Sequence, residues 1–255
     1  MDVRRLCHPL RCLVAGLLLA ARVTAASSAE SAAQDSQGET PFQRTLFERC
    51  PHAAEALKLQ HQAADRRRGP PIEQVERPML RRELLLRREQ DQAVRGGTKS
   101  STTSPDMEKE YLREVDADNL RRLKHIIRQD GFLTARMVGY DGLAAAWLLV
   151  QHADSDPAFQ AEMLTEVRRR VKSRELDLQL YALLTDRVLL AQGKKQRYGT
   201  QFEVGEQGLT VRPLEDPDRV DERRRAVGLI SLADYACTLK VFNEVRAGDG
   251  SRSPR

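Results

Sequence analysis

The sequence is poor in aromatic residues and has no long apolar run beyond its first 25 residues. Aromatic residues make up 5% of the 255 residues and charged residues 31%. This balance favours a helical protein with long solvated faces over a β-sandwich. A transmembrane helix needs about 20 apolar residues, and no later stretch offers them, so we expect no membrane span in the mature chain.

The composition also does not indicate nucleic-acid binding. The net charge is +5, but four arginines and one aspartate in residues 1–25 account for +3 of it. The other arginines are spread along the chain, with few aromatic side chains among them to stack on bases. We therefore expect no nucleic-acid partner.

Recognised catalytic and cofactor signatures are missing as well. There is no Gly-x-Ser-x-Gly elbow, and Gly139-Tyr-Asp-Gly142 is too short for a phosphate-cradling loop or a dinucleotide fingerprint. The histidines, cysteines and acidic residues do not follow a zinc spacing. We therefore predict no cofactor and no metal, and whether the protein is an enzyme stays open.

The first 25 residues have the pattern of an export signal. Arg4 and Arg5 form a positive start, Leu13 to Ala21 an apolar segment, and Val23-Thr24-Ala25 an A-x-A-like cleavage site. A membrane anchor is disfavoured, because this segment is far shorter than the ~20 apolar residues that a span needs. We expect cleavage near Ala25, a periplasmic or secreted protein, and a disordered linker over 26–40.

Two of the four cysteines, Cys50 and Cys237, lie outside the signal segment. An exported compartment permits a disulfide, which would join the N-terminal helical region to the last helix. Two unpaired thiols are the alternative, because the sequence alone does not give the distance between the two residues.

The apolar periodicity predicts a mainly α fold: a single compact helical domain with one small β-hairpin, preceded by extra N-terminal helices. Two helical pieces that separate at Pro51 form an N-terminal extension over 41–76. The domain itself spans 77–246, and 247–255 is a disordered tail. Helices are expected over about 77–95, 107–129, 138–150, 157–171, 175–191, 217–227 and 231–245, with the hairpin at about 198–214.

One helix is expected to organise the core. It holds the only tryptophan, Trp147, and no charged residue lies between Asp141 and His152. A helix that is apolar all round is normally buried. We expect this helix to end in a polar group formed by Gln151, His152 and Asp154.

Two arginines, Arg187 and Arg224, occupy positions where helical periodicity predicts apolar side chains. A buried guanidinium stays charged and needs a carboxylate, a carbonyl or an anion as its partner. One interpretation is a structural ion pair, or a stem along apolar surface with a solvated head. The other is a pocket for a small anionic ligand such as a carboxylate or phosphate. The candidate acidic partners are Asp91, Asp141, Asp154 and Asp221.

His152 is the candidate general base, because histidine alone has an ordinary pKa near neutral pH. Asp154 or Asp186 would orient its ring. The competing interpretation is a hydrogen-bonded core histidine, since no nucleophile accompanies it in the sequence. Tyr198 and Gln201, at the start of the hairpin, would lie at the rim of the same pocket or form only a turn and an edge strand.

Several motifs follow one another along the domain. They are Asp91-Gln92-x-x-Arg95, Val138-Gly-x-Asp-Gly with Trp-Leu-Leu-Val-Gln-His-Ala-Asp, Leu-x-Asp-Arg-Val, Gln-x-Tyr-Gly-Thr-Gln and Val-Asp-x-x-Arg-x-x-x-Gly-Leu. Together they resemble a family of bacterial, often exported proteins described as a domain of unknown function. The resemblance covers about Leu84 to Tyr235, so residues 41–78 lie outside it.

The resemblance supplies no activity, but it implies that one set of polar residues forms a shared cluster. Phe132-Leu133 departs from it, because the family often has a Trp-Pro pair there, so the entry to the following helix is expected to differ. The family pattern maps onto Asp91, Gln92, Arg95, Gln151, His152, Asp154, Asp186, Arg187, Gln196, Tyr198, Gly199, Gln201, Asp221 and Arg224.

Two functions fit these patterns. The first is a non-catalytic exported domain whose buried polar cluster is a structural network or binds a small ligand or peptide. The second is an exported hydrolase with His152 as general base, Asp154 or Asp186 orienting it, and arginines holding an anionic substrate. The first is preferred, because no complete nucleophile–base or metal set is visible. The candidate ligand-binding residues are Gln151, Arg187, Tyr198, Gln201, Arg224, Asp91 and Arg95.

Overall fold

The structure, a computed structural model, describes residues 40–96, 104–205 and 208–249. The predicted signal peptide, the linker up to residue 39 and residues 250–255 of the tail lie outside this range. The predicted fold class is confirmed: the described part is mainly helical with one antiparallel hairpin. None of the helices within it is long and apolar enough to cross a membrane.

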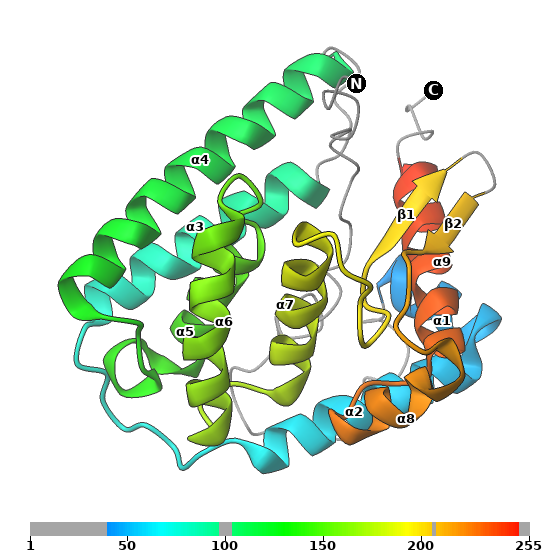
Figure 1. The fold of residues 1–255 in the computed structure, drawn as a ribbon, viewed down its shortest axis with the longest axis horizontal. Coiled ribbons are helices and arrows are strands. Elements are labelled where there is room, and N and C mark those ends of the chain that lie inside the picture. Colours follow the sequence, from blue (N-terminus) through cyan, green and yellow to red (C-terminus); the bar gives the residue numbers. More distant parts are fainter. Residues whose placement is uncertain (1–39, 97–103, 206–207, 250–255) are drawn as a thin grey trace, which may run out of the picture.

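Most of the helices lie in three groups. Figure 1 shows α5, α6 and α7 in the middle, between the α3–α4 pair on one side and α1, α9 and the hairpin on the other. The elements in chain order are α1 (Pro41–Arg49), α2 (Pro51–Arg67), α3 (Pro78–Gly96), α4 (Pro105–Asp130), α5 (Ala135–Gln151), α6 (Pro157–Lys172), α7 (Leu178–Ala191), β1 (Phe202–Gly205), β2 (Gly208–Val211), a 3-10 turn (Pro217–Arg219), α8 (Val220–Ala226) and α9 (Leu232–Asp249).

The central helix α5 is buried, as its lack of charge predicts. Leu143 and the residues from Ala145 to Gln151 are all buried. The indole N–H of Trp147 donates to the carbonyl of Leu180 in α7 at 3.1 Å. Side chains from α3 to α7 complete the main apolar core around this helix.

The Val138-Gly-x-Asp-Gly motif shapes the start of α5. Gly139 has a φ of 74°, and a Cβ there would lie 2.7 Å from Oδ1 of Asp141, so the position requires glycine. The Asp141 carboxylate accepts from the N–H of Gly142 at 2.8 Å and pairs with Arg81 of α3 at 2.6 and 2.9 Å. The motif therefore caps the main part of α5 and fastens α3 to it.

The N-terminal extension is fastened to the end of the domain. The chain breaks between α1 and α2 at Cys50-Pro51, as predicted, and both helices contact α9. Cys50 and Cys237 form a disulfide, so of the two alternatives the bridge holds. Gln60 of α2 also accepts from the N–H of Ile230 at 3.0 Å and donates to Gln179 at 3.3 Å. The extension is thus packed against the domain.

Four segments differ from the prediction. α9 continues to Asp249, so it includes residues 247–249 of the predicted tail. α7 begins at Leu178 instead of 175, because the N–H groups of the two residues after Arg174 close the end of α6 on the carbonyl of Arg170. The strands of the hairpin are shorter than expected. The backbone N–H groups of Tyr198 and Thr200 donate to the carboxylate of Asp186 instead of pairing with the second strand. The helix predicted over 217–227 is a 3-10 turn followed by the short α8.

Candidate functional site

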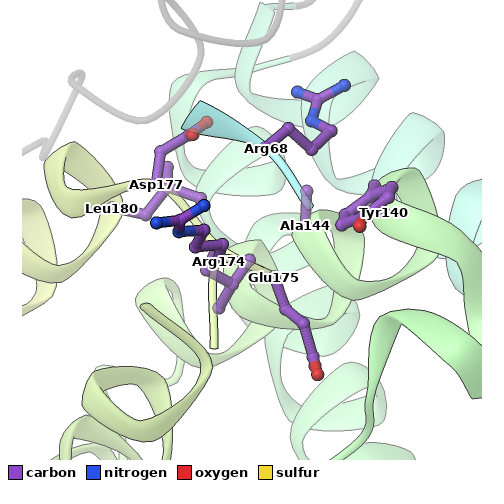
Figure 2. A pocket seen from close by; sticks show the side chains of 8 residues that line it. Arg68, Tyr140, Ala144, Arg174, Glu175, Asp177 and Leu180 are labelled. Carbon is purple, nitrogen blue, oxygen red and sulfur yellow. The ribbon is translucent and has the colours of Figure 1, made fainter. Parts of the chain in front are cut away.

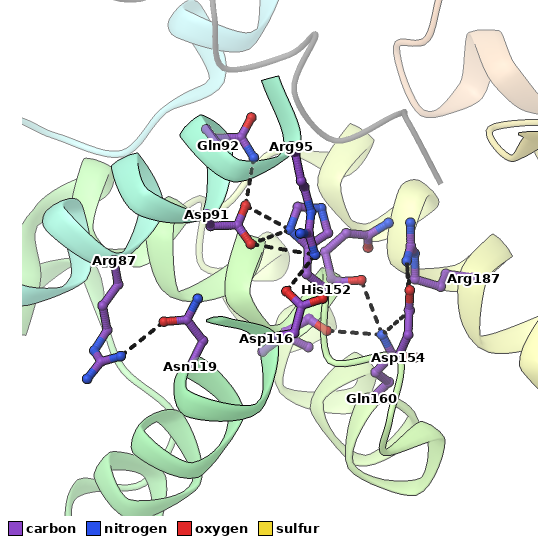
Figure 3. A network of polar contacts seen from close by, with 12 residues as sticks. Arg87, Asp91, Gln92, Arg95, Asp116, Asn119, His152, Asp154, Gln160 and Arg187 are labelled. Atoms are coloured by element: carbon purple, nitrogen blue, oxygen red, sulfur yellow. Dashed lines mark hydrogen bonds and ion pairs between the residues drawn. The ribbon is translucent and has the colours of Figure 1, made fainter. Parts of the chain in front are cut away.

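The C-terminal end of α5 lies where α3, α4, α6 and α7 meet, and polar side chains from these helices converge there (Figure 3). Six ionisable residues make up what we call the His152 network. They are Asp91 and Arg95 from α3, Asp116 from α4, His152 and Asp154 at and after the end of α5, and Arg187 from α7.

His152 is held by Asp91. Nδ1 of His152 lies 2.8 and 2.9 Å from the two carboxylate oxygens of Asp91, which is fully buried. Burial lowers the pKa of His152 to about 4, so its ring is neutral at pH 7. Because a carboxylate only accepts, the ring proton lies on Nδ1 and donates to Asp91. Nε2 is therefore left as a proton-free acceptor.

Asp116 is the residue through which α4 joins the network. Its carboxylate accepts from Arg95 at 2.7 Å, and Arg95 also lies 3.7 Å from Asp91. Burial raises the pKa of Asp116 to about 6; the charges of Asp91 and Asp154 act in the same direction, and Arg95 acts against them. Asp116 therefore exchanges a proton close to neutral pH.

Arg187 and Asp154 form the other end of the network. One terminal nitrogen of the buried Arg187 donates to both oxygens of Asp154, at 2.7 and 2.6 Å. Gln160 of α6 donates to Asp154 and to two carbonyls at the end of α5, each at 3.2 Å. Asp154 thus binds Arg187, and it is not the residue that orients His152. The arginine on an apolar helix face is in an ion pair, which is one of the two predicted alternatives.

Several buried side-chain atoms have no hydrogen-bond partner in the described part of the chain, and they include Nδ2 of Asn119 and Nη2 of Arg224. Three of them belong to two adjacent residues at the end of α5: Nε2 of His152 and both amide atoms, Oε1 and Nε2, of Gln151. The side chain of His152 is 3% exposed, and Gln151 is 0% exposed. A buried polar group without a partner costs about 1–3 kcal/mol. A bound molecule that supplied these hydrogen bonds would remove that cost.

Asp186 has a different role from the one expected. Its carboxylate accepts three backbone N–H groups of the segment 197–200 at 2.7 to 2.9 Å, and the Thr200 hydroxyl at 2.9 Å. These bonds hold the chain ahead of β1 in a turn, which is why it does not extend the hairpin. Asp186 therefore orients a loop, and the residue that holds His152 is Asp91.

Arg224 is fully buried, and its partners are carbonyls instead of the aspartates expected. It donates to Ile230 at 2.6 Å, to Tyr198 at 2.6 Å and to Gly199 at 3.1 Å, and its guanidinium lies 4.9 Å from the ring centre of Tyr235. The side chain of Tyr198 packs in a small separate apolar cluster. Arg224 and Tyr198 thus belong to a closed part of the core and not to the network.

A short bridge connects the network with this loop region. Arg187 lies 3.4 Å from Oε1 of Gln201, and the Gln201 amide donates to the Thr200 hydroxyl at 3.0 Å. That hydroxyl in turn donates to Asp186. Of the residues proposed from the sequence, Gln201 therefore contacts the network, whereas Asp186 is joined to it only indirectly.

Asp116 and Gln160 are site residues that the sequence reasoning missed. Asp116 lies four residues after Leu112 and four before Leu120, so it interrupts an apolar stripe of α4. The same kind of interruption pointed to Arg187. Gln160 gives no comparable signal, because its role is to pair with the end of a helix that is close in space only after folding.

Elsewhere in the described chain, the candidates for a binding site are weaker than the His152 network. A small hollow between the end of α2, the start of α5 and the α6–α7 loop contains none of the predicted site residues (Figure 2). Two of its polar groups contact other parts of the protein: Arg68 lies 5.5 Å from the ring centre of Tyr140, whose hydroxyl donates to the carbonyl of Pro70. No group of three or more His, Cys, Asp or Glu side chains in the described ranges is placed to hold a metal ion.

Comparison with known proteins gives one match. A family model described as a family of unknown function (DUF6624) matches residues 78–245. This range runs from the start of α3 into α9, so it includes the whole His152 network and leaves out α1 and α2. The family resemblance inferred from the sequence is confirmed. No curated protein and no solved structure matches the chain.

Proposed function

We propose that this chain, which belongs to the DUF6624 family, is an exported helical domain that binds a small polar ligand at the His152 network. The observation that carries this proposal is that two adjacent buried side chains at the end of α5 have polar atoms without a partner among the described residues, Nε2 of His152 and the amide of Gln151. Buried polar groups in native proteins are normally hydrogen-bonded, so these exceptions need a reason. A ligand that donates to Nε2 and pairs with the amide supplies one.

A purely structural network is the main competing explanation. It accounts for Asp91, Asp116 and Asp154, because each pairs with His152 or with an arginine inside the network. It does not account for Gln151, because an apolar side chain of similar shape would fill that position without the penalty of an unpaired amide. A ligand-binding role explains why the amide is there.

The ligand is not expected to be held by the arginines, although the sequence suggested an anion. The guanidinium of Arg187 binds Asp154, and that of Arg95 binds Asp116. Arg224 binds carbonyls within a closed part of the core. The ligand is therefore expected to contact Nε2 of His152 and the Gln151 amide directly.

Export is supported by two independent features. Residues 1–25 have the composition of a signal peptide, and Cys50 and Cys237 are bonded, a state that is rare in reducing compartments. Expression of the full chain in a bacterial host should yield exported protein whose first residue lies near position 26. Full-length protein retained in the cytoplasm with Met1 intact would argue against export.

The binding proposal is tested by Gln151→Leu, with Gln160→Leu as the matched control. Gln160 makes three hydrogen bonds, so its loss should destabilise the fold by about 1–3 kcal/mol. Gln151→Leu should melt at or above the wild-type temperature. It should also abolish the melting shifts that a panel of amino acids, amines and sugars produces in the wild type. A loss of stability equal to that of Gln160→Leu would instead make Gln151 structural.

A second function, exported hydrolase, is favoured by the orientation of His152. Asp91 holds Nδ1, so the lone pair of Nε2 is available to take a proton from a water molecule that attacks a bound ester or amide. Ester hydrolysis should then fall as pH decreases toward the His152 pKa of about 4, and His152→Gln should abolish it. Equal rates in His152→Gln and wild type would exclude this function.

A further inference from the structure

We infer that the ligand of the His152 network carries a cationic amino group, which binds at the solvent-facing edge between Asp116 and Asp154. This inference rests on the proposed function and names its ligand class. It follows from the charge balance of the network, from the exposure of its carboxylates and from the polarity of its unpartnered atoms.

The charges of the network do not balance. Three carboxylates face two guanidiniums, and the ring of His152 is neutral at pH 7. Among the described residues of this network, one negative charge is therefore in excess whenever Asp116 is ionised. A buried or half-buried charge without a counter-charge is unfavourable, and the two ways to remove it are a proton or a cation.

The excess charge lies at the open edge of the network. The side chain of Asp91 is fully buried, whereas that of Asp116 is 24% exposed and that of Asp154 is 56% exposed. Asp116 and Asp154 come from different elements, and each is held by its own arginine, Arg95 or Arg187. They are nevertheless close enough for the charge of Asp154 to raise the pKa of Asp116. An ammonium group bound at this edge would be attracted by both carboxylates.

Two of the unpartnered atoms need a donor. Nε2 of His152 can only accept a hydrogen bond in the neutral ring, and Oε1 of Gln151 also accepts. An ammonium group has three N–H donors and no acceptor, so it suits these two atoms. The N–H groups of the Gln151 amide need an acceptor in the rest of the ligand.

The test measures binding of four small probes to the full mature chain at pH 7.5. Butylamine and glycinamide carry the cation, the first as a lysine side-chain analogue and the second as a peptide N-terminus. Butanol and butyrate are the neutral and anionic counterparts of butylamine. Calorimetry and thermal shift should show saturable binding of at least one amine, and affinities for butanol and butyrate at least tenfold weaker.

Two variants test whether the amine binds at the edge between Asp116 and Asp154. Asp116→Asn removes the excess charge and should weaken amine binding at least tenfold, whereas Glu114→Gln, an exposed acid on the same helix, should leave it within twofold. If Asp116→Asn does not fold, the pH dependence of amine binding to the wild type provides the test. Protonation of Asp116 below its pKa of about 6 should weaken amine binding between pH 7.5 and 5.

Each remaining outcome counts against the inference. It is overturned if both amines fail to bind at tens of millimolar, if the two acid variants change affinity equally, or if amine affinity is unchanged at pH 5. Binding of butanol or butyrate that requires Gln151 would overturn the inference and leave the proposed function standing. Melting of Gln151→Leu well below wild type would remove the proposed function itself.

Discussion

Replacing Asp116 by asparagine should uncover a pH dependence of stability that the wild type conceals. The folded-state pKa of His152 is about 4, below the unfolded value of about 6.5, so the unfolded chain binds more protons between these limits. His152 therefore lowers stability as pH falls through this window. Asp116 acts in the opposite direction, because its folded pKa of about 6 lies above the unfolded value of about 3.9 and the folded protein gains the proton.

The two effects nearly cancel in the wild type. Between pH 7 and pH 4.5, proton linkage gives a loss of about 2.5 kcal/mol from His152 and a gain of about 2 kcal/mol from Asp116. In Asp116→Asn only the loss from His152 remains. The melting temperature of the variant should therefore fall by roughly 4–8 °C more than that of the wild type over this pH range.

Thermal melts of wild type, Asp116→Asn and Glu114→Gln at constant ionic strength provide the measurement. Glu114→Gln makes the same charge change at an exposed position of the same helix, so its curve should follow the wild type. The reasoning is refuted if Asp116→Asn runs parallel to the wild type from pH 7 to 4.5. It is also refuted if Glu114→Gln diverges as much as Asp116→Asn.

Two further predictions concern the core. The Cys50–Cys237 bridge spans 187 residues, so the chain-entropy argument gives up to about 5 kcal/mol of stabilisation. The double serine variant should lose a large part of this in urea unfolding, and an unchanged midpoint would contradict it. Arg224→Met should cost about 3–5 kcal/mol by leaving buried carbonyls without a donor. Arg187→Met should cost less, because Asp154 is half-exposed and water can solvate it, and the reverse order in chemical denaturation would refute this.

The sequence predicts the fold better than the pairing within the site. Apolar periodicity locates α5, and the Gly139 and Asp141 positions of its motif have a clear local reason. Arg187 is recognisable because a charge on an apolar helix face requires a partner. The partner of His152 is not recognisable in the same way. Asp91 lies 61 residues away, and the expected partners were Asp154 and Asp186.

The assignment of Asp186 illustrates the same limit. The family resemblance implied that Asp186 and Arg187 share one cluster, but adjacent residues on a helix point about 100° apart. Arg187 turns to Asp154, while Asp186 turns to the backbone of 197–200. Which of two neighbouring charged residues faces the end of α5 depends on how α7 is rotated against α5 and α6. That rotation is set by the packing of the whole core.

The N-terminal extension lies outside the family match, yet hydrogen bonds lead from it to the His152 network. Gln60 accepts from Ile230, whose carbonyl accepts from Arg224, and Arg224 holds the carbonyls of the 198–199 turn. The same loop contains Gln201, whose side-chain oxygen accepts from Arg187 of α7. Contiguous contacts do not by themselves transmit a signal, since that requires an element with two arrangements. They do make the extension and the network parts of one packed unit, because these hydrogen bonds and the short segment 198–201 join Gln60 to Arg187.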